Sequence, residues 1–123
     1  MIQFASNWTM VDKMSFLERK ILLNSILYYD YNTNIISDFH YNEISQQLAQ
    51  MIKERPTLLA KSRYGYAFKG FEGSTGFDLF AKLTKEDQLY LRSIVDYQQG
   101  TITLSQLANN VVIIDAKTKG KLF

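Results

Sequence analysis

The sequence predicts a mainly α-helical single domain built on an antiparallel helical hairpin, with a minor β or irregular segment in the middle. Three observations support this fold class. Apolar residues recur every three or four positions in two stretches, helix-capping residues precede both stretches, and four of the six glycines lie together after them. With 123 residues, of which 46% are apolar, the chain is large enough to bury one core.

We therefore expect one domain over residues 1–123. Its expected parts are a helical hairpin over 15–62, a segment rich in glycine and aromatic residues over 63–76, C-terminal helices over 77–110 and a basic tail over 115–123.

The first helix of the hairpin is predicted from about 16 to 31. Ser15-Phe-Leu-Glu18 matches a capping box, in which the serine hydroxyl and the glutamate carboxylate each accept a hydrogen bond from an otherwise unpaired backbone amide. The helix has an apolar stripe at helical spacing, and the segment Asn32-Thr-Asn34 ends it. Residues expected on or beside this stripe are Phe16, Leu17, Ile21, Leu23, Asn24, Leu27 and Tyr28.

The second helix is predicted to begin after Ser37 as its cap and to end near Arg55, because the residue before Pro56 is disfavoured in helical geometry. About five residues join the two helices, so the helices must lie nearly antiparallel. Tyr28 and Tyr41 then come close together at one end of the hairpin, near Asp38. The expected apolar stripe of this helix is Tyr41, Ile44, Leu48, Met51 and Ile52.

The second half of the chain contains less regular patterns. Residues 62–76 alternate aromatic residues with glycines, which favours a short β-hairpin or an irregular segment. Helices are expected over 77–83, over 85–98 with Thr84 as cap and Gly100 as stop, and over 104–109 with Thr103 and Gln106 as a capping box. Residues 111–114 are expected to form a short buried strand or an extended tail.

Composition excludes several kinds of chemistry. The chain has no cysteine and a single histidine, His40, so it offers no disulfide, no thiol nucleophile, no zinc site and no Ser-His-Asp triad. We predict no catalytic residue, no metal and no required cofactor. The sequence has neither an apolar run long enough for a membrane span nor the pattern of a signal peptide, and we expect a cytoplasmic protein.

Basic and aromatic residues interleave in the middle of the chain, and we predict an interaction surface there. Its residues are Lys53, Arg55, Lys61, Arg63, Tyr64, Tyr66 and Lys69. Such a surface suits a host or phage protein, or a nucleic acid whose bases stack on the rings. The alternative is structural: lysines in loops often serve solubility alone, and the aromatic run then packs over the hairpin as a lid.

One stretch carries a resemblance to a known family. It reads Leu27-Tyr-Tyr-Asp-Tyr-Asn-Thr-Asn-Ile-Ile-Ser-Asp-Phe-His-Tyr-Asn-Glu-Ile44, and Glu54-Arg-Pro56 follows it. This pattern resembles the N-terminal domain of bacterial NAD-dependent DNA ligases, which recognises the nicotinamide mononucleotide (NMN) half of NAD. The resemblance covers about residues 16–62. It implies a helical hairpin that binds NMN or NAD.

The resemblance also implies a set of ligand-binding residues. Tyr28 corresponds to the stacking tyrosine, Tyr29 to the position that is His or Tyr, Asp38 to the loop carboxylate and Tyr41 to the second aromatic residue. Aromatic faces and a carboxylate both attract the cationic nicotinamide ring. Asn42 departs from the family, which has Asp there, and so removes one negative charge.

A second departure concerns catalysis. The chain has no Lys-x-Asp-Gly motif, whose lysine forms the covalent adenylate in this superfamily, so these residues alone do not make a ligase. Two functions remain open. One is a stand-alone NMN- or NAD-binding accessory in DNA metabolism, encoded by a phage or other mobile element; the other is a small interaction or inhibitor protein that keeps the fold without the ligand. Helical spacing alone also allows Tyr28 and Tyr41 to be core residues and Asp38 to be only a first-turn carboxylate.

Overall fold

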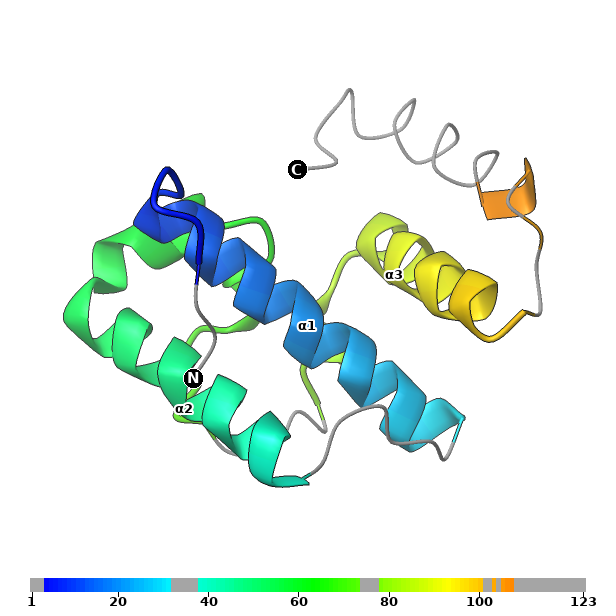
Figure 1. Ribbon diagram of the computed structural model, residues 1–123, viewed down its shortest axis with the longest axis horizontal. Coiled ribbons are helices and arrows are strands. Elements are labelled where there is room, and N and C mark those ends of the chain that lie inside the picture. The colour runs from blue at the N-terminus through cyan, green and yellow to red at the C-terminus, as the bar shows by residue number, and fades with distance from the viewer. Residues whose placement is uncertain (1–3, 32–37, 74–77, 101–102, 104, 108–123) are drawn as a thin grey trace. The chain divides into compact units, whose positions relative to one another are not determined.

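A computed structural model describes residues 4–31, 38–73, 78–100, 103 and 105–107. The fold is mainly helical, as predicted (Figure 1). The labelled elements of the described residues follow one another in this order: α-helix α1 (Met10–Asp30), α-helix α2 (Asp38–Glu54), 3-10 helices η1 (Pro56–Lys61), η2 (Gly65–Ala67) and η3 (Phe80–Lys82), and α-helix α3 (Lys85–Gln98). The middle segment is irregular rather than β, since none of the described residues forms a strand.

Helix α1 begins about six residues earlier than predicted. Its N-cap is Thr9, whose hydroxyl accepts a hydrogen bond from the Asp12 amide at 3.1 Å while the Asp12 carboxylate accepts one from the Thr9 amide at 3.0 Å. This is the capping box of the helix, and the prediction that Ser15 and Glu18 form it was wrong. The two sequence patterns are alike, and only the actual start of the helix distinguishes them.

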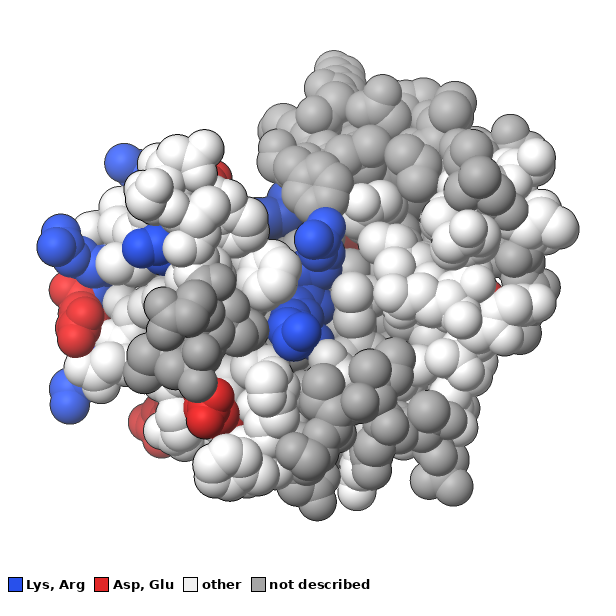
Figure 2. All heavy atoms as spheres, in the orientation of Figure 1, with Lys and Arg blue, Asp and Glu red and all other residues white. Residues whose placement is uncertain are grey.

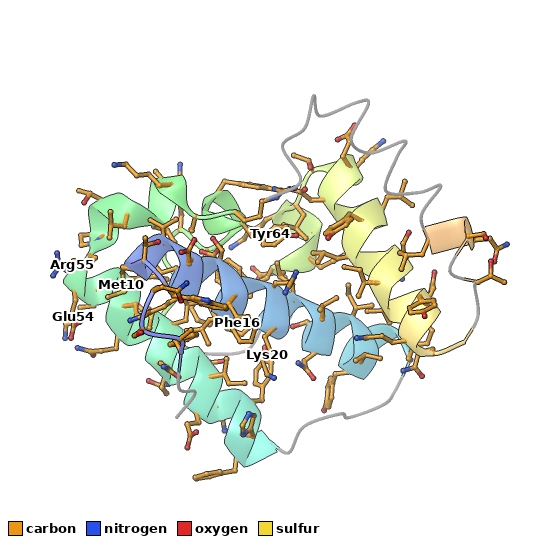
Figure 3. The ribbon with its side chains drawn as sticks, turned by 45° about the horizontal axis from the view of Figure 1, so that its top comes forward. Met10, Phe16, Lys20, Glu54, Arg55 and Tyr64 are labelled. Carbon is orange, nitrogen blue, oxygen red and sulfur yellow. The ribbon has the colours of Figure 1, made fainter. Side chains whose placement is uncertain are left out.

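Helices α1 and α2 form the predicted antiparallel pair (Figure 1). In Figure 3, Met10 at the start of α1 lies near Glu54 and Arg55 at the end of α2, as an antiparallel arrangement requires. The 3-10 helices η1 and η3 also contact α1, and η2 contacts η1. The buried apolar residues of this part are Met14, Leu17, Ile21, Leu22, Ile26, Leu27, Ile44, Leu48, Leu59, Tyr64, Ala67, Phe68 and Leu79.

Gly65 is required by a close approach of two backbone segments. A Cβ at this position would overlap the carbonyl oxygen of Leu59 in η1. The backbone of η1 cannot retreat from the core without losing the buried Leu59 side chain, so a residue without Cβ is needed here. One glycine of the predicted Gly/aromatic segment therefore has a packing role.

The described contacts group the chain into two compact units, Met1–Lys82 and Leu83–Phe123. In the second unit, α3 confirms the predicted helix: the Thr84 hydroxyl accepts from the Asp87 amide at 3.2 Å, and Gly100 follows with φ +78°. The single domain over residues 1–123 that the sequence suggested stays a prediction.

The remaining C-terminal predictions have mixed outcomes. The helix expected over 77–83 is a single 3-10 turn, Phe80–Lys82. Thr103 and Gln106 make both hydrogen bonds of the predicted capping box, at 2.7 Å and 3.2 Å. The expected strand over 111–114 and the basic tail lie outside the described residues.

Candidate functional site

One hydrogen bond joins the two hairpin helices close to the loop that connects them. The hydroxyl oxygens of Ser25 on α1 and Tyr41 on α2 lie 3.4 Å apart, and Ser25 also donates to the Ile21 carbonyl oxygen at 2.8 Å. Ser25 is buried and Tyr41 is half-buried. The contact therefore fixes Tyr41 against α1 within one turn of Tyr28.

Tyr28 lies at the surface although its position belongs to the predicted apolar stripe. Half of it, 50%, is exposed, while the next apolar residue before it, Leu27, is buried. Asn42, beside Tyr41, is also exposed, and Phe39 in the first turn of α2 is 76% exposed. This end of the hairpin thus presents aromatic side chains to solvent. We call Tyr28, Phe39, Tyr41 and Asn42 the hairpin-end surface.

Two of the ligand-binding residues implied by the resemblance cannot be placed in this surface. Asp38 is the first residue of α2 and Tyr29 belongs to the last turn of α1, but the side chains of both lie outside the described part of the structure. The connection between the helices, residues 32–37, lies outside it as well. The structure therefore brings Tyr28, Tyr41 and Asn42 to one end of the hairpin and leaves the other two as predictions.

The structure exposes five of the seven residues of the predicted basic and aromatic surface. The cations Lys53, Arg55, Lys61 and Lys69 are all exposed, and Tyr66 is 40% exposed. In Figure 2, lysine and arginine side chains form several separate groups on the face in view, some of them next to acidic side chains.

Tyr64, however, is completely buried, so its assignment to the interaction surface was wrong. Its ring is covered on one side by the Arg63 guanidinium, 4.7 Å from the ring centre, and Arg63 itself is half-buried. Phe68, in the same aromatic run, is buried too and contacts Phe71 edge-to-face at 5.1 Å. The aromatic run therefore packs inward as a lid, which is the structural alternative described above.

A buried carboxyl group holds this lid on α1. Glu18 is fully buried and accepts a hydrogen bond from the Tyr64 amide at 2.9 Å, while the Ser62 hydroxyl lies 2.6 Å from its other oxygen. One turn earlier on α1, the Ser15 hydroxyl accepts from the Arg63 amide at 2.9 Å. Ser15 and Glu18, the pair that resembles a capping box, thus bind three consecutive residues of the lid. We call this contact the Glu18 anchor.

The Ser62 hydroxyl lies within hydrogen-bond distance of two oxygen atoms, one from Glu18 and one from Leu59. The single hydroxyl proton of Ser62 has two acceptors within reach, the Leu59 carbonyl oxygen at 2.8 Å and Glu18 at 2.6 Å. The Ser62 hydroxyl can donate to only one of these oxygens at a time. Burial raises the pKa of Glu18 from 4.5 to about 7, although the hydrogen bonds from Ser62 and Tyr64 and the charge of Arg63 act in the opposite direction.

Sequence reasoning missed one cluster. Phe4 and Trp8, which precede α1, pack on Phe16 of the helix. The sequence analysis placed the start of the helix at residue 16. The helical turns that precede Phe16, which bring it close to Phe4 and Trp8, were therefore not expected. The signal that would have found the cluster is the Thr9-x-x-Asp12 capping pattern.

Searches for membrane and metal-binding features gave no candidate in the described residues. None of their helices combines the length and the apolar character that crossing a membrane demands. Nor do three potential His, Asp or Glu ligands come together around one point in this part of the chain.

Comparison of the chain with protein-family models, with curated proteins and with solved structures found no match. The resemblance to the ligase domain therefore rests on the quoted residues alone.

Proposed function

We propose that this protein is a non-catalytic module that binds NMN or NAD at the hairpin-end surface. The observation that carries the proposal is the position of two tyrosines: the Ser25–Tyr41 contact holds Tyr41 against the last turns of α1, where Tyr28 is half exposed. An exposed ring at the end of α1, with a second tyrosine on the neighbouring helix at the same end of the hairpin, suits a flat, cationic ligand such as nicotinamide. The fold, an antiparallel hairpin, is the one that the resemblance implies.

The proposed roles follow from the chemistry of the ligand. Tyr28 stacks on the nicotinamide ring, Tyr41 provides the second aromatic contact, and Asn42 hydrogen-bonds the carboxamide or ribose. Tyr29 and Asp38 complete the site as the resemblance implies. These residues lack the adenylation lysine motif, so the module acts with a catalytic partner in cytoplasmic DNA metabolism, encoded by a phage or another mobile element.

Titration calorimetry with NMN, and separately with NAD, tests the proposal. We expect saturable heat with NMN for the unmodified protein. Tyr28→Ala should weaken binding about 2- to 30-fold, which corresponds to the 0.5–2 kcal/mol of one cation–π contact. Asn42→Asp should strengthen it, because it restores a negative charge beside a cationic ring.

The matched control is Tyr66→Ala, which removes a similarly exposed tyrosine from the same unit outside the site. Circular dichroism of every variant checks that the helices are intact. An absence of heat at millimolar NMN, or equal weakening by Tyr66→Ala and Tyr28→Ala, contradicts the proposal.

A second candidate function is charge-driven binding of a protein partner. It is favoured by the exposure of four cations on α2, η1 and the segment after η2, namely Lys53, Arg55, Lys61 and Lys69. Retention of a specific partner from a bacterial lysate should be lost on Lys61→Glu and Lys69→Glu, and should not require NAD. Unchanged retention after both charge reversals rules this surface out.

A further inference from the structure

The outward face of α1 carries three aromatic rings packed together. Phe16 contacts Trp8 at 5.5 Å and Phe4 at 6.0 Å between ring centres, both edge-to-face, and Phe4 lies 5.5 Å from Trp8. All three residues are half-buried, so part of each remains accessible. They belong neither to the core nor to the hairpin-end surface.

Two lysines from the same helix lie over these rings. The Lys13 ammonium group is 5.7 Å from the centre of the Phe4 ring, and that of Lys20 is 6.0 Å from the centre of Phe16. Figure 3 shows Phe16 and Lys20 projecting together from α1. Seven residues separate the two lysines, which places them about two turns, or roughly 10 Å, apart along the helix. We call Phe4, Trp8, Lys13, Phe16 and Lys20 the α1 aromatic surface.

This surface has the combination that the sequence led us to expect elsewhere. In the segment after α2 the cations are exposed, but Tyr64 and Phe68 are buried and Tyr66 is the exposed tyrosine of the aromatic run. On α1, three partly accessible rings and two cations contact one another. A surface of this kind matches a single nucleic-acid strand, whose bases stack on rings while its phosphates meet cations.

We propose that the α1 aromatic surface binds single-stranded nucleic acid. Packing of the rings on one another accounts for how Phe4 and Trp8 are held on the helix, and the ammonium groups of the two lysines lie over Phe4 and Phe16. An acidic protein segment would use those charges but not the flat rings. A single strand uses both, and it is bound without base specificity because every base has a π-face.

The test uses the only tryptophan of the chain as a reporter. Titration with an oligothymidylate of about twelve nucleotides should quench Trp8 fluorescence and raise the anisotropy of a labelled strand. Lys13→Ala with Lys20→Ala should weaken binding at least about tenfold, and should reduce the slope of log K against log salt by about 1.4, since each phosphate contact to a single strand contributes about 0.7. The matched control, Lys61→Ala with Lys69→Ala, removes two exposed cations elsewhere and should leave binding unchanged.

Three results would overturn the proposal: no anisotropy change at 50 mM salt, equal weakening by the two lysine pairs, or competition by polyglutamate as strong as that by unlabelled strand. The last result identifies an acidic protein surface as the ligand instead. Failure here is separable from failure of the NMN proposal, because Tyr28→Ala should leave strand binding intact and the Lys13, Lys20 variant should leave NMN binding intact.

Discussion

Two tyrosine-bearing regions of the hairpin unit use the same residue type in opposite ways. Around the Glu18 anchor, Tyr64 is fully buried, its amide donates to a buried carboxyl group, and its ring is covered by Arg63. At the hairpin-end surface, Tyr28 is half exposed, and the Tyr41 hydroxyl makes a long contact to Ser25 at 3.4 Å. In the first region the polar groups hold the lid on α1, whereas in the second region aromatic side chains remain at the surface.

The difference shows what separates a structural tyrosine from a candidate ligand tyrosine. Tyr28 follows the apolar residue Leu27, whereas Tyr64 lies between Arg63 and Gly65, so the immediate sequence neighbours suggest burial for the wrong tyrosine. The backbone contacts of the segment determine whether the tyrosine is buried. Ser62, Arg63 and Tyr64 all hydrogen-bond to α1, and the Tyr64 side chain lies in the core as a result. Substitutions in the two regions should therefore differ strongly in their effect on stability.

The largest expected difference in stability is between alanine substitutions of Tyr64 and Tyr28. Tyr64→Ala should lower the free energy of unfolding by about 4 kcal/mol, because it leaves a large cavity in the core. Tyr28→Ala should lower it by less than about 1 kcal/mol, since half of that side chain is already in water. Urea unfolding followed by circular dichroism measures both. Equal losses would mean that Tyr28 is a core residue.

The Glu18 anchor should make stability depend on pH. The folded-state pKa of Glu18 is raised to about 7 from 4.5, so between these values the unfolded chain has released the proton and the folded chain retains it. The unfolding free energy should therefore fall as pH rises from about 4.5 to about 7, by about 3 kcal/mol in total. Urea unfolding at a series of pH values measures this loss.

Glu18→Gln is the control for that pH dependence. Its amide oxygen can accept from the Tyr64 amide and its NH₂ can donate to Ser62, so it reproduces the neutral carboxyl group. The difference in pH profile between the unmodified protein and this variant isolates Glu18 from His40 and the surface carboxylates. Parallel profiles would show that Glu18 ionises normally in the folded chain.

Gly65 tests how closely the lid follows η1. Gly65→Ala should cost about 2–3 kcal/mol, because the added Cβ meets the Leu59 backbone carbonyl. Gly70 is the matched glycine: it has φ +77° but open space around it, so Gly70→Ala should cost only about 1 kcal/mol from backbone strain. Thermal unfolding of both variants separates the steric from the conformational effect, and the reverse order would contradict the packing described here.

The smallest effect concerns the hydroxyl contact between α1 and α2. Tyr41→Phe should cost about 0.5–1 kcal/mol, the usual value of one hydrogen bond between uncharged groups. Combining it with Ser25→Ala in a double-mutant cycle isolates the pair, since Ser25 also donates to Ile21. A coupling energy of zero would remove the observation on which the placement of Tyr41 depends.

Features set by interactions between residues close in the sequence could be predicted, and features set by distant residues could not. Local signals succeeded: Thr84 and Gly100 delimit α3, and the antiparallel pairing of α1 and α2 follows from their short connection. The reading failed where a local pattern had a distant partner. Ser15 and Glu18 have the spacing of a capping box, yet their partners are 44 to 48 residues away, at Ser62, Tyr64 and Arg63.

The same distinction applies to the two candidate sites, the hairpin-end surface and the α1 aromatic surface. Tyr28, Tyr41 and Asn42 were found from the sequence and do share one end of the hairpin, because two adjacent helices fix them. The α1 aromatic surface was not found, because Phe4 and Trp8 reach Phe16 only once the helix begins at Met10.

The sequence by itself determined the helical class, the hairpin and the limits of α3, since helical periodicity, caps and short connections act within a few residues. Only the tertiary structure decided which tyrosines are buried and why the pKa of Glu18 is raised. Burial and the pairing of buried polar groups depend on segments that meet in space, and a buried carboxyl group acquires its pKa from the core that encloses it.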